Sequence, residues 1–187
     1  MRLGILGGTF DPIHIGHLIL GEVAREELAL DQVLFVPTGV QWRKAAREIA
    51  PAEHRVAMAR LAIAGNPAFV LSTVEVDRPG PSYTADTLEQ LRETYPDAGM
   101  FFIVGRDALE DMPNWVRPER IRELATIAVA ARCGAAPSEG AEWLSMPAIG
   151  ISATDIRERV AAGRSIRYLV PPTVETYIRE HSLYKNP

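Results

Sequence analysis

Residues 3–17 read Leu-Gly-Ile-Leu-Gly-Gly-Thr-Phe-Asp-Pro-Ile-His-Ile-Gly-His, an apolar strand that meets paired glycines and then brings two histidines to the start of an apolar-periodic helix. Because Gly7 and Gly8 lack a Cβ, the chain there can turn sharply and bring its N–H groups close to a ligand. The helix that follows offers unpaired amides and the positive end of its dipole. His14 and His17 are three residues apart, so both can face one anion. The stretch predicts a phosphate site.

Each of these features has a simpler explanation by itself, since paired glycines usually make a tight turn and a single histidine is usually structural. The combination is more specific, because Gly-x-Phe-Asp-x-x-His-x-Gly-His defines the residue at six of ten positions between a predicted strand and a predicted helix. It resembles the signature of the nucleotidylyltransferase superfamily, whose His-x-Gly-His element also occurs in class I aminoacyl-tRNA synthetases.

The composition indicates a single domain whose core needs neither a disulfide nor a metal for stability. A chain of 187 residues buries about 70% of its unfolded surface. Its one cysteine, Cys133, excludes an intramolecular disulfide, and neither a signal peptide nor an apolar membrane span is recognisable. A net charge of −4 argues against a general nucleic-acid binder. We therefore expect a cytoplasmic protein with no membrane or nucleic-acid partner, and leave a homo-oligomer open.

The rest of the chain alternates between apolar runs typical of buried strands and amphipathic stretches typical of helices. After the first strand, further strands are expected near 33–36, 69–76, 100–104, 126–131 and 149–151, and helices near 17–30, 51–64, 83–95, 108–112, 118–125, 152–163 and 171–181. Ser82 or Thr84 is expected to cap the helix at 83–95, and Ser152 with Asp155 is expected to cap the helix at 152–163. This order predicts a Rossmann-like, doubly wound α/β fold with a parallel sheet in one domain, 1–187.

Several further segments match one branch of the superfamily. They are Tyr83-Thr84-Ala85-Asp86-Thr87-Leu88, Gly105-x-Asp107-x-Leu109, Trp115, Ile151-Ser152-x-Thr154-x-Ile156-Arg157, and Val170-Pro171 with Tyr177-Ile178. Over nearly the whole chain they resemble the bacterial nicotinate-nucleotide adenylyltransferases. The resemblance implies transfer of AMP from ATP, with Mg²⁺, to nicotinate mononucleotide, which gives nicotinic acid adenine dinucleotide and pyrophosphate in NAD biosynthesis.

This chemistry asks the protein for alignment and charge neutralisation. A nucleotide 5′-phosphate is already an anion at pH 7 and can attack the α-phosphorus of ATP without a protein base or a covalent intermediate. We assign His14 and His17 to the ATP phosphates, with His17 nearest the α-phosphoryl group, and Lys44 to a phosphate as a mobile charge.

The helix that begins near Ser152 is the second predicted phosphate site. Ser152, Thr154 and Arg157 would hold the β- and γ-phosphates at its amino end, and the helical part 152–187 would close this site. The alternative is that the two hydroxyls only cap the helix while Arg157 is a solvated charge.

The acceptor site is expected around Trp115, whose indole could stack on the pyridinium ring or could merely cover core. The resemblance implies that the backbone N–H groups of Tyr83 and Thr84 donate hydrogen bonds to the nicotinate carboxylate. Asp107 would bind ribose hydroxyls, and Arg132 would contact nucleotide or remain a surface arginine. The remaining predicted substrate-binding residues are Gly7, Gly8, Thr9, Phe10, Gly105 and Ile151. We expect no protein-bound metal, and we interpret His54, His181, Cys133 and Trp143 as structural.

Two departures from the family pattern concern the nucleotide. Arg106 replaces a commonly small residue, and the loop at 40–44 differs from a Pro-Pro-His-Lys-like sequence. These departures leave open a sister nucleotidylyltransferase that uses nicotinamide mononucleotide, phosphopantetheine or CTP, and also a non-catalytic nucleotide-binding module. A dehydrogenase is disfavoured because the first strand does not lead to Gly-x-Gly-x-x-Gly.

Overall fold

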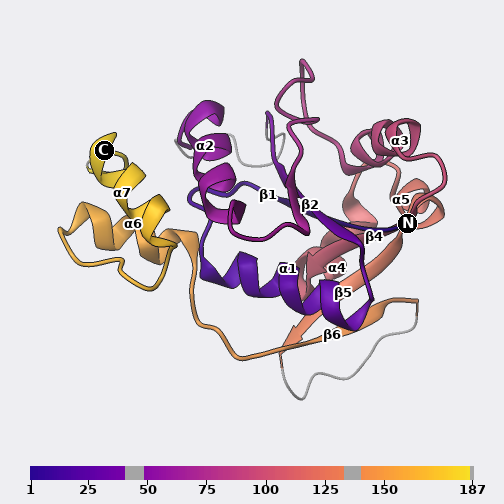
Figure 1. The fold of residues 1–187 in the computed structure, drawn as a ribbon. Helices are drawn as coiled ribbons and strands as arrows, with labels where there is room; N and C mark the ends of the chain where they lie inside the picture. Colours follow the sequence, from indigo (N-terminus) through magenta and orange to yellow (C-terminus); the bar gives the residue numbers. More distant parts are fainter. Residues whose placement is uncertain (41–48, 133–139, 186–187) are drawn as a thin grey trace.

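The computed structural model describes residues 1–40, 49–132 and 140–185, with the side chains of 131 and 132 left out. Within these ranges one parallel sheet has the strand order β3-β2-β1-β4-β5-β6 (Figure 1). Its strands are β1 (Arg2–Gly8), β2 (Gln32–Pro37), β3 (Phe69–Leu71), β4 (Gly99–Gly105), β5 (Thr126–Arg132) and β6 (Glu142–Met146). The doubly wound α/β prediction is confirmed.

Helices cover both faces of this sheet. The helices of the described residues are α1 (Ile15–Glu27), α2 (Ala52–Ile63), α3 (Thr84–Thr94), α4 (Arg106–Asp111), η1 (Met112–Asn114), α5 (Pro118–Leu124), α6 (Ala153–Ala161) and α7 (Pro172–Glu180). Helices α1 and α2 pack on one face, α3 and α5 on the other, and α7 packs against α2. No helix in the described ranges is long and apolar enough to cross a bilayer.

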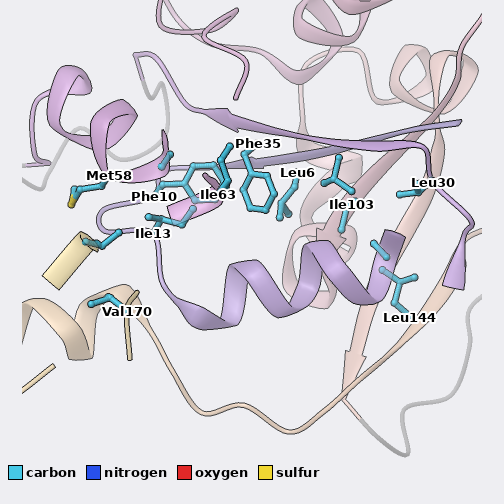
Figure 2. Close-up of a cluster of buried hydrophobic side chains, with 14 of the residues drawn as sticks. Leu6, Phe10, Ile13, Leu30, Phe35, Met58, Ile63, Ile103, Leu144 and Val170 are labelled. Atoms are coloured by element: carbon cyan, nitrogen blue, oxygen red, sulfur yellow. The ribbon is translucent and has the colours of Figure 1, made fainter. Parts of the chain in front are cut away.

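The strands are apolar on both sides because successive side chains point to opposite faces and both faces are covered. In β2, for example, Phe35 belongs to the cluster under α1 and α2, whereas Leu34 belongs to the cluster under α3 and α5. Figure 2 shows the first cluster, where Phe10, Ile13 and Met58 meet Val170 from the carboxyl-terminal part. The segment after β6 is therefore anchored in the main core.

The strand order reverses between β1 and β4. These two strands are neighbours, with Leu6 opposite Ile103, yet their crossovers lead to opposite ends of the sheet. Open α/β sheets bind ligands at such a switch point, outside the carboxyl ends of the strands. Gly8 and Gly105 end the two strands there, so the predicted phosphate motif and the predicted Gly105–Asp107 site lie side by side.

Two strand predictions were wrong. Residues 149–151 form no strand; the last strand is β6, which pairs with β5 at Ala130 and Leu144. The triplet at 149–151 is too short to compete with the five-residue β6, whose Leu144 is buried. The strand expected at 69–76 ends at Leu71 because the chain turns, with Asp77 N–H donating to Thr73 O at 2.9 Å.

The capping predictions had different outcomes. Tyr83, not Ser82 or Thr84, is the N-cap of α3, and no side chain caps that helix. Ser152 does cap α6, with its Oγ accepting from Asp155 N–H at 3.0 Å. Gly163 has a φ of +65°, the left-handed conformation that glycine adopts readily after a helix.

Candidate active site

His14 and His17 lie at the amino end of α1 and stack on each other. Their ring centroids are 3.7 Å apart, with 25° between the planes. His14 is the N-cap, and its N–H donates to His17 Nδ1 at 3.1 Å. Because Nδ1 of His17 accepts a hydrogen bond, the neutral ring carries its proton on Nε2. His17 is thereby prepared to donate one hydrogen bond from the far side of its ring.

Phe10 fixes the orientation of His17. The Phe10 ring meets His17 edge-on, with centroids 5.0 Å apart and 89° between the planes, and it is only 2% exposed. Its φ of +49° shows that the chain turns here. The prediction of a turn at Gly7 and Gly8 was wrong, because β1 runs through both. A Cβ on Gly8 would lie 2.9 Å from the Phe10 ring, so this glycine gives the ring its space.

His17 borders three adjoining cavities in the described structure. We name them the Met146 cavity, of about 810 Å³, the Arg157 cavity, of about 720 Å³, and the Trp115 cavity, of about 450 Å³. Gly105, at the end of β4, also borders all three, whereas His14 borders the first two. The imidazole of His17, at the switch point of the sheet, thus borders all three cavities.

The Arg157 cavity is rich in hydrogen-bond donors. Its lining includes Thr9, Asp107, Ile151, Ser152, Thr154 and Arg157. The Arg157 guanidinium donates to the Asp11 carbonyl oxygen at 2.5 Å and to Thr154 Oγ1 at 2.9 Å, and its side chain is only 15% exposed. Arg157 is therefore not the solvated charge of the simpler alternative. Ser152 does cap its helix, and it borders the cavity as well.

The Trp115 cavity lies between β1, β4 and the start of α3. Trp115 is half-buried, packs edge-on against Phe102, and donates from Nε1 to Asp111 Oδ2 at 2.9 Å. One part of the indole thus covers core, as the alternative states, while another part borders the cavity with Thr84. Gly7, Gly8 and Thr9 also border it, whereas the N-cap Tyr83 lies outside the lining.

The Met146 cavity opens between α1, α4 and the segment that follows β6. Met146, Pro147, Ile149 and Ile151 line it together with Asp107. Arg106 borders it at the start of α4 and pairs with Glu110 at 2.8 Å, both side chains being more than half exposed. The long cation that departs from the family pattern is directed along its own helix by this ion pair.

Two predicted site residues cannot be placed. Lys44 lies outside the described residues, as does most of the divergent 40–44 loop. Arg132 ends β5, with its Cα opposite Met146, but its side chain lies outside the described part.

Of the residues interpreted as structural, Cys133 also lies outside the described residues. His54 forms a hydrogen bond with Tyr177 Oη at 2.9 Å, which joins α2 to α7.

Sequence reasoning missed several residues of the site. Asp11 and Glu75 are buried carboxyl groups, Arg55 is a buried guanidinium, and Tyr184 reaches the site from the end of the chain. Glu75 borders the Trp115 cavity; burial raises its pKa, which the hydrogen bond from Thr87 opposes. Asp11 had a signal, because it is part of the opening motif. No local sequence pattern pointed to Glu75, Arg55 or Tyr184.

Burial keeps both histidines neutral at pH 7. It lowers the pKa of His14 from 6.5 to about 4. Burial, together with the nearby His14, lowers the pKa of His17 well below its ordinary value. The arrangement thus offers neutral donors in a poorly solvated place, and a bound anion would favour their protonated forms.

The pH dependence of stability follows from the lowered pKa of His14. Between pH 6.5 and 4 the unfolded chain binds more protons than the native one, so the free energy of unfolding falls as the pH falls through this range. The His14 contribution to this loss is on the order of 3 kcal/mol. Urea unfolding at pH 7 and pH 4 should therefore show a smaller pH effect in His14→Gln. An equal pH effect in both proteins would contradict the assignment.

A family profile matches most of the chain, and several relatives of known family match nearly all of it. The sequence profile described as cytidylyltransferase-like matches residues 5–159. The probable nicotinate-nucleotide adenylyltransferase of Thermomicrobium roseum is 50% identical, over 98% of this chain and 92% of its own. That of Thermus thermophilus is 48% identical, over 99% of this chain and 100% of its own.

Solved structures agree in fold. The nicotinic acid mononucleotide adenylyltransferase of Plasmodium falciparum, complexed with APC, has a TM-score of 0.78 at 19% identity, covering 98% of this chain and 96% of its own. The same enzyme complexed with NaAD has a TM-score of 0.77. At this identity the likeness concerns the fold alone.

Proposed function

The chain belongs to the cytidylyltransferase-like family and, within it, to the nicotinate-nucleotide adenylyltransferases, and from this premise we propose how its three cavities divide the reaction. The enzyme transfers AMP from ATP to nicotinate mononucleotide, giving nicotinic acid adenine dinucleotide and pyrophosphate for NAD biosynthesis. We assign the mononucleotide to the Trp115 cavity, adenosine to the Met146 cavity and the β- and γ-phosphates to the Arg157 cavity. We place the enzyme in the cytoplasm, without a nucleic-acid partner.

The observation that carries this assignment is the position of His17 on all three cavities. The reacting phosphorus must lie where acceptor, adenosine and leaving group meet. An oxygen of the acceptor 5′-phosphate attacks it and forms the new P–O bond. The bond to the oxygen that bridges the α- and β-phosphates breaks, and that oxygen leaves with pyrophosphate. His17 Nε2–H donates to the α-phosphoryl oxygens as their charge redistributes.

The other residues act by position and charge. Arg157, with Ser152 and Thr154 at the amino end of α6, holds the leaving phosphates, so that the helical part 152–187 closes this end of the site. Lys44 is assigned to the same phosphates. Asp107 is assigned to a ribose, and the α3 amides of Tyr83 and Thr84 to the nicotinate carboxylate. The indole of Trp115 in the lining favours an acceptor with a flat ring, and the polar Thr84 borders the same cavity.

Mg²⁺ enters with ATP as part of the substrate. The described residues contain no group of three or more His, Cys, Asp or Glu side chains with metal-site geometry. Mg²⁺ commonly keeps several waters and binds substrate phosphates with one or two carboxylates. The Arg157 cavity, which is lined by hydrogen-bond donors and by the carboxylates of Asp11 and Asp107, fits such a phosphate-bound ion.

Trp115 gives the acceptor site its own test. Trp115→Ala should raise KM for nicotinate mononucleotide by about five- to thirtyfold, because stacking on a cationic ring contributes about 1–2 kcal/mol where it is partly desolvated. KM for ATP should change less than twofold. Steady-state kinetics with each substrate varied in turn measure both values, and Trp143→Phe, in the edge strand β6, is the control. Equal changes in the two KM values would refute the stacking role.

Pyrophosphate release tests the function itself. The purified protein should release pyrophosphate rapidly with Mg²⁺, ATP and nicotinate mononucleotide. Nicotinamide mononucleotide and phosphopantetheine should be poor acceptors. CTP should be a poor replacement for ATP. Faster release with one of these would make the chain a sister enzyme and would implicate Arg106 or the 40–44 loop. ATP binding without any release would identify a nucleotide-binding module.

A further inference from the structure

A buried carboxylate in the lining of the Arg157 cavity connects three distant segments of the chain. Asp11 is 2% exposed. Its Oδ1 accepts from Tyr184 Oη at 2.8 Å and from the backbone N–H of Ala50 at 3.3 Å. Tyr184 is 173 positions away in the sequence, so this bond joins the carboxyl-terminal segment directly to the turn of the phosphate motif.

Two guanidinium groups, the buried Arg55 and the largely buried Arg157, flank the same turn. Arg157 donates to the carbonyl oxygen of Asp11, and its Nη1 lies 3.8 Å from Asp11 Oδ2. Arg55, 4% exposed, donates to the carbonyl oxygens of Thr9 at 2.8 Å and Ala50 at 3.0 Å. Burial lowers the pKa of Arg55, and the charge of Asp11 opposes this. Because a buried cation without a counter-charge is strongly destabilised, Asp11 is electrostatically important here.

The carboxyl-terminal segment folds back to reach Asp11. After α7 the backbone takes φ values of +51° at Ser182 and +61° at Tyr184, a region that side chains other than glycine rarely adopt. Leu183 N–H closes the turn by donating to Ile178 O at 3.0 Å. Burial and the Asp11 carboxylate raise the pKa of Tyr184 above its ordinary value, so its hydroxyl remains a donor. The bond from this segment to Asp11 thus depends on the phenol oxygen of Tyr184.

We propose that Tyr184 and Asp11 are positioning residues, which hold the Thr9–Asp11 turn and the Arg157 guanidinium in place for the phosphates of a nucleoside triphosphate. Arg157 carries five N–H donors in a planar fork. Its bonds to Asp11 and Thr154 fix the orientation of this fork at the wall of the cavity. The inference rests on the proposed function for the identity of the ligand. It goes further in giving the end of the chain a role in ATP affinity.

Tyr184→Phe is the first test, since it removes one oxygen and leaves the ring. We expect KM for ATP to rise about three- to tenfold, with KM for nicotinate mononucleotide changed less than twofold. Tyr168→Phe, at a tyrosine that is 84% exposed, should leave both values unchanged. A purely structural role for Tyr184 would lower the melting temperature and leave the ratio of the two KM values as in the wild type, which would overturn the proposal.

A double-mutant cycle shows whether Tyr184 acts through Arg157. In the Arg157→Ala background, Tyr184→Phe should raise KM for ATP no further; an equal second rise would overturn the proposal. Asp11→Asn, which keeps an acceptor for Tyr184 but removes the charge, should also weaken ATP selectively. Calorimetric titration of each variant with ATP alone measures the loss of ATP affinity in the absence of turnover. A wild-type protein that binds ATP without releasing pyrophosphate would reject the function, while these titrations would still decide on the positioning role.

Discussion

His17→Ala is expected to lower kcat by a factor on the order of 10²–10³, the loss seen when one preorganised donor is removed from a developing oxyanion. The ring of His17 is fixed by the stacked His14, the edge-on Phe10 and the bond from His14 N–H, so its Nε2–H needs no reorganisation during the reaction. The loss should appear in kcat, with a smaller change in KM for either substrate, because the donor acts on charge that redistributes in the transition state.

The control for this prediction is His181→Ala. His181 is exposed after α7, where it stacks on Tyr177 and borders none of the three cavities. Its replacement should leave kcat within twofold. Steady-state pyrophosphate release at saturating substrates measures kcat, and thermal unfolding monitors the fold. Near-normal turnover of His17→Ala would remove the histidine from the mechanism, whatever its place among the cavities.

Arg157→Ala is expected to lower kcat/KM for ATP by about 10–10², since a charge-assisted hydrogen bond contributes about 1.5–3 kcal/mol. The guanidinium is preorganised by its bonds to Asp11 and Thr154 and is largely removed from water. Arg157→Lys should recover only part of the loss. A lysine keeps the charge but lacks the planar fork that bonds two protein oxygens and a phosphate together.

Arg159→Ala provides the matched control on the same helix. Arg159 lies two positions further along α6 and donates to Ser165 O at 3.1 Å, outside the lining of the Arg157 cavity. Its kcat/KM for ATP should stay within twofold of the wild type. If Arg157→Ala and Arg159→Ala behaved alike, the helix would matter only for net charge, and the assignment of the leaving phosphates to this cavity would be wrong.

Local patterns predicted most of the elements. Continuous apolar runs marked β2, β4 and β5, because these strands are buried on both faces, and amphipathic spacing marked α1 and α3. The patterns were misleading at the edges of the sheet. There β3 stops after Leu71, and β6 is a short strand of mixed polar and apolar residues, in which only Leu144 is buried. Edge strands are decided by one neighbour and by the turn that follows, which local hydrophobicity does not report.

The sequence by itself determined the class of fold, the family and the candidate residues for its chemistry, because periodicity, motif spacing and residue type act over short ranges. It placed His14 and His17 at a helix start and Arg157 beyond a capping serine, and both placements hold. Only the tertiary structure decided that one imidazole faces three cavities, and that Gly8 makes room for Phe10. Asp11 meets Arg157 and Tyr184 across 146 and 173 positions. Such contacts depend on how α7 packs against α2 and how Ile156 of α6 joins the main core cluster, a collective outcome of the whole core that no local pattern contains.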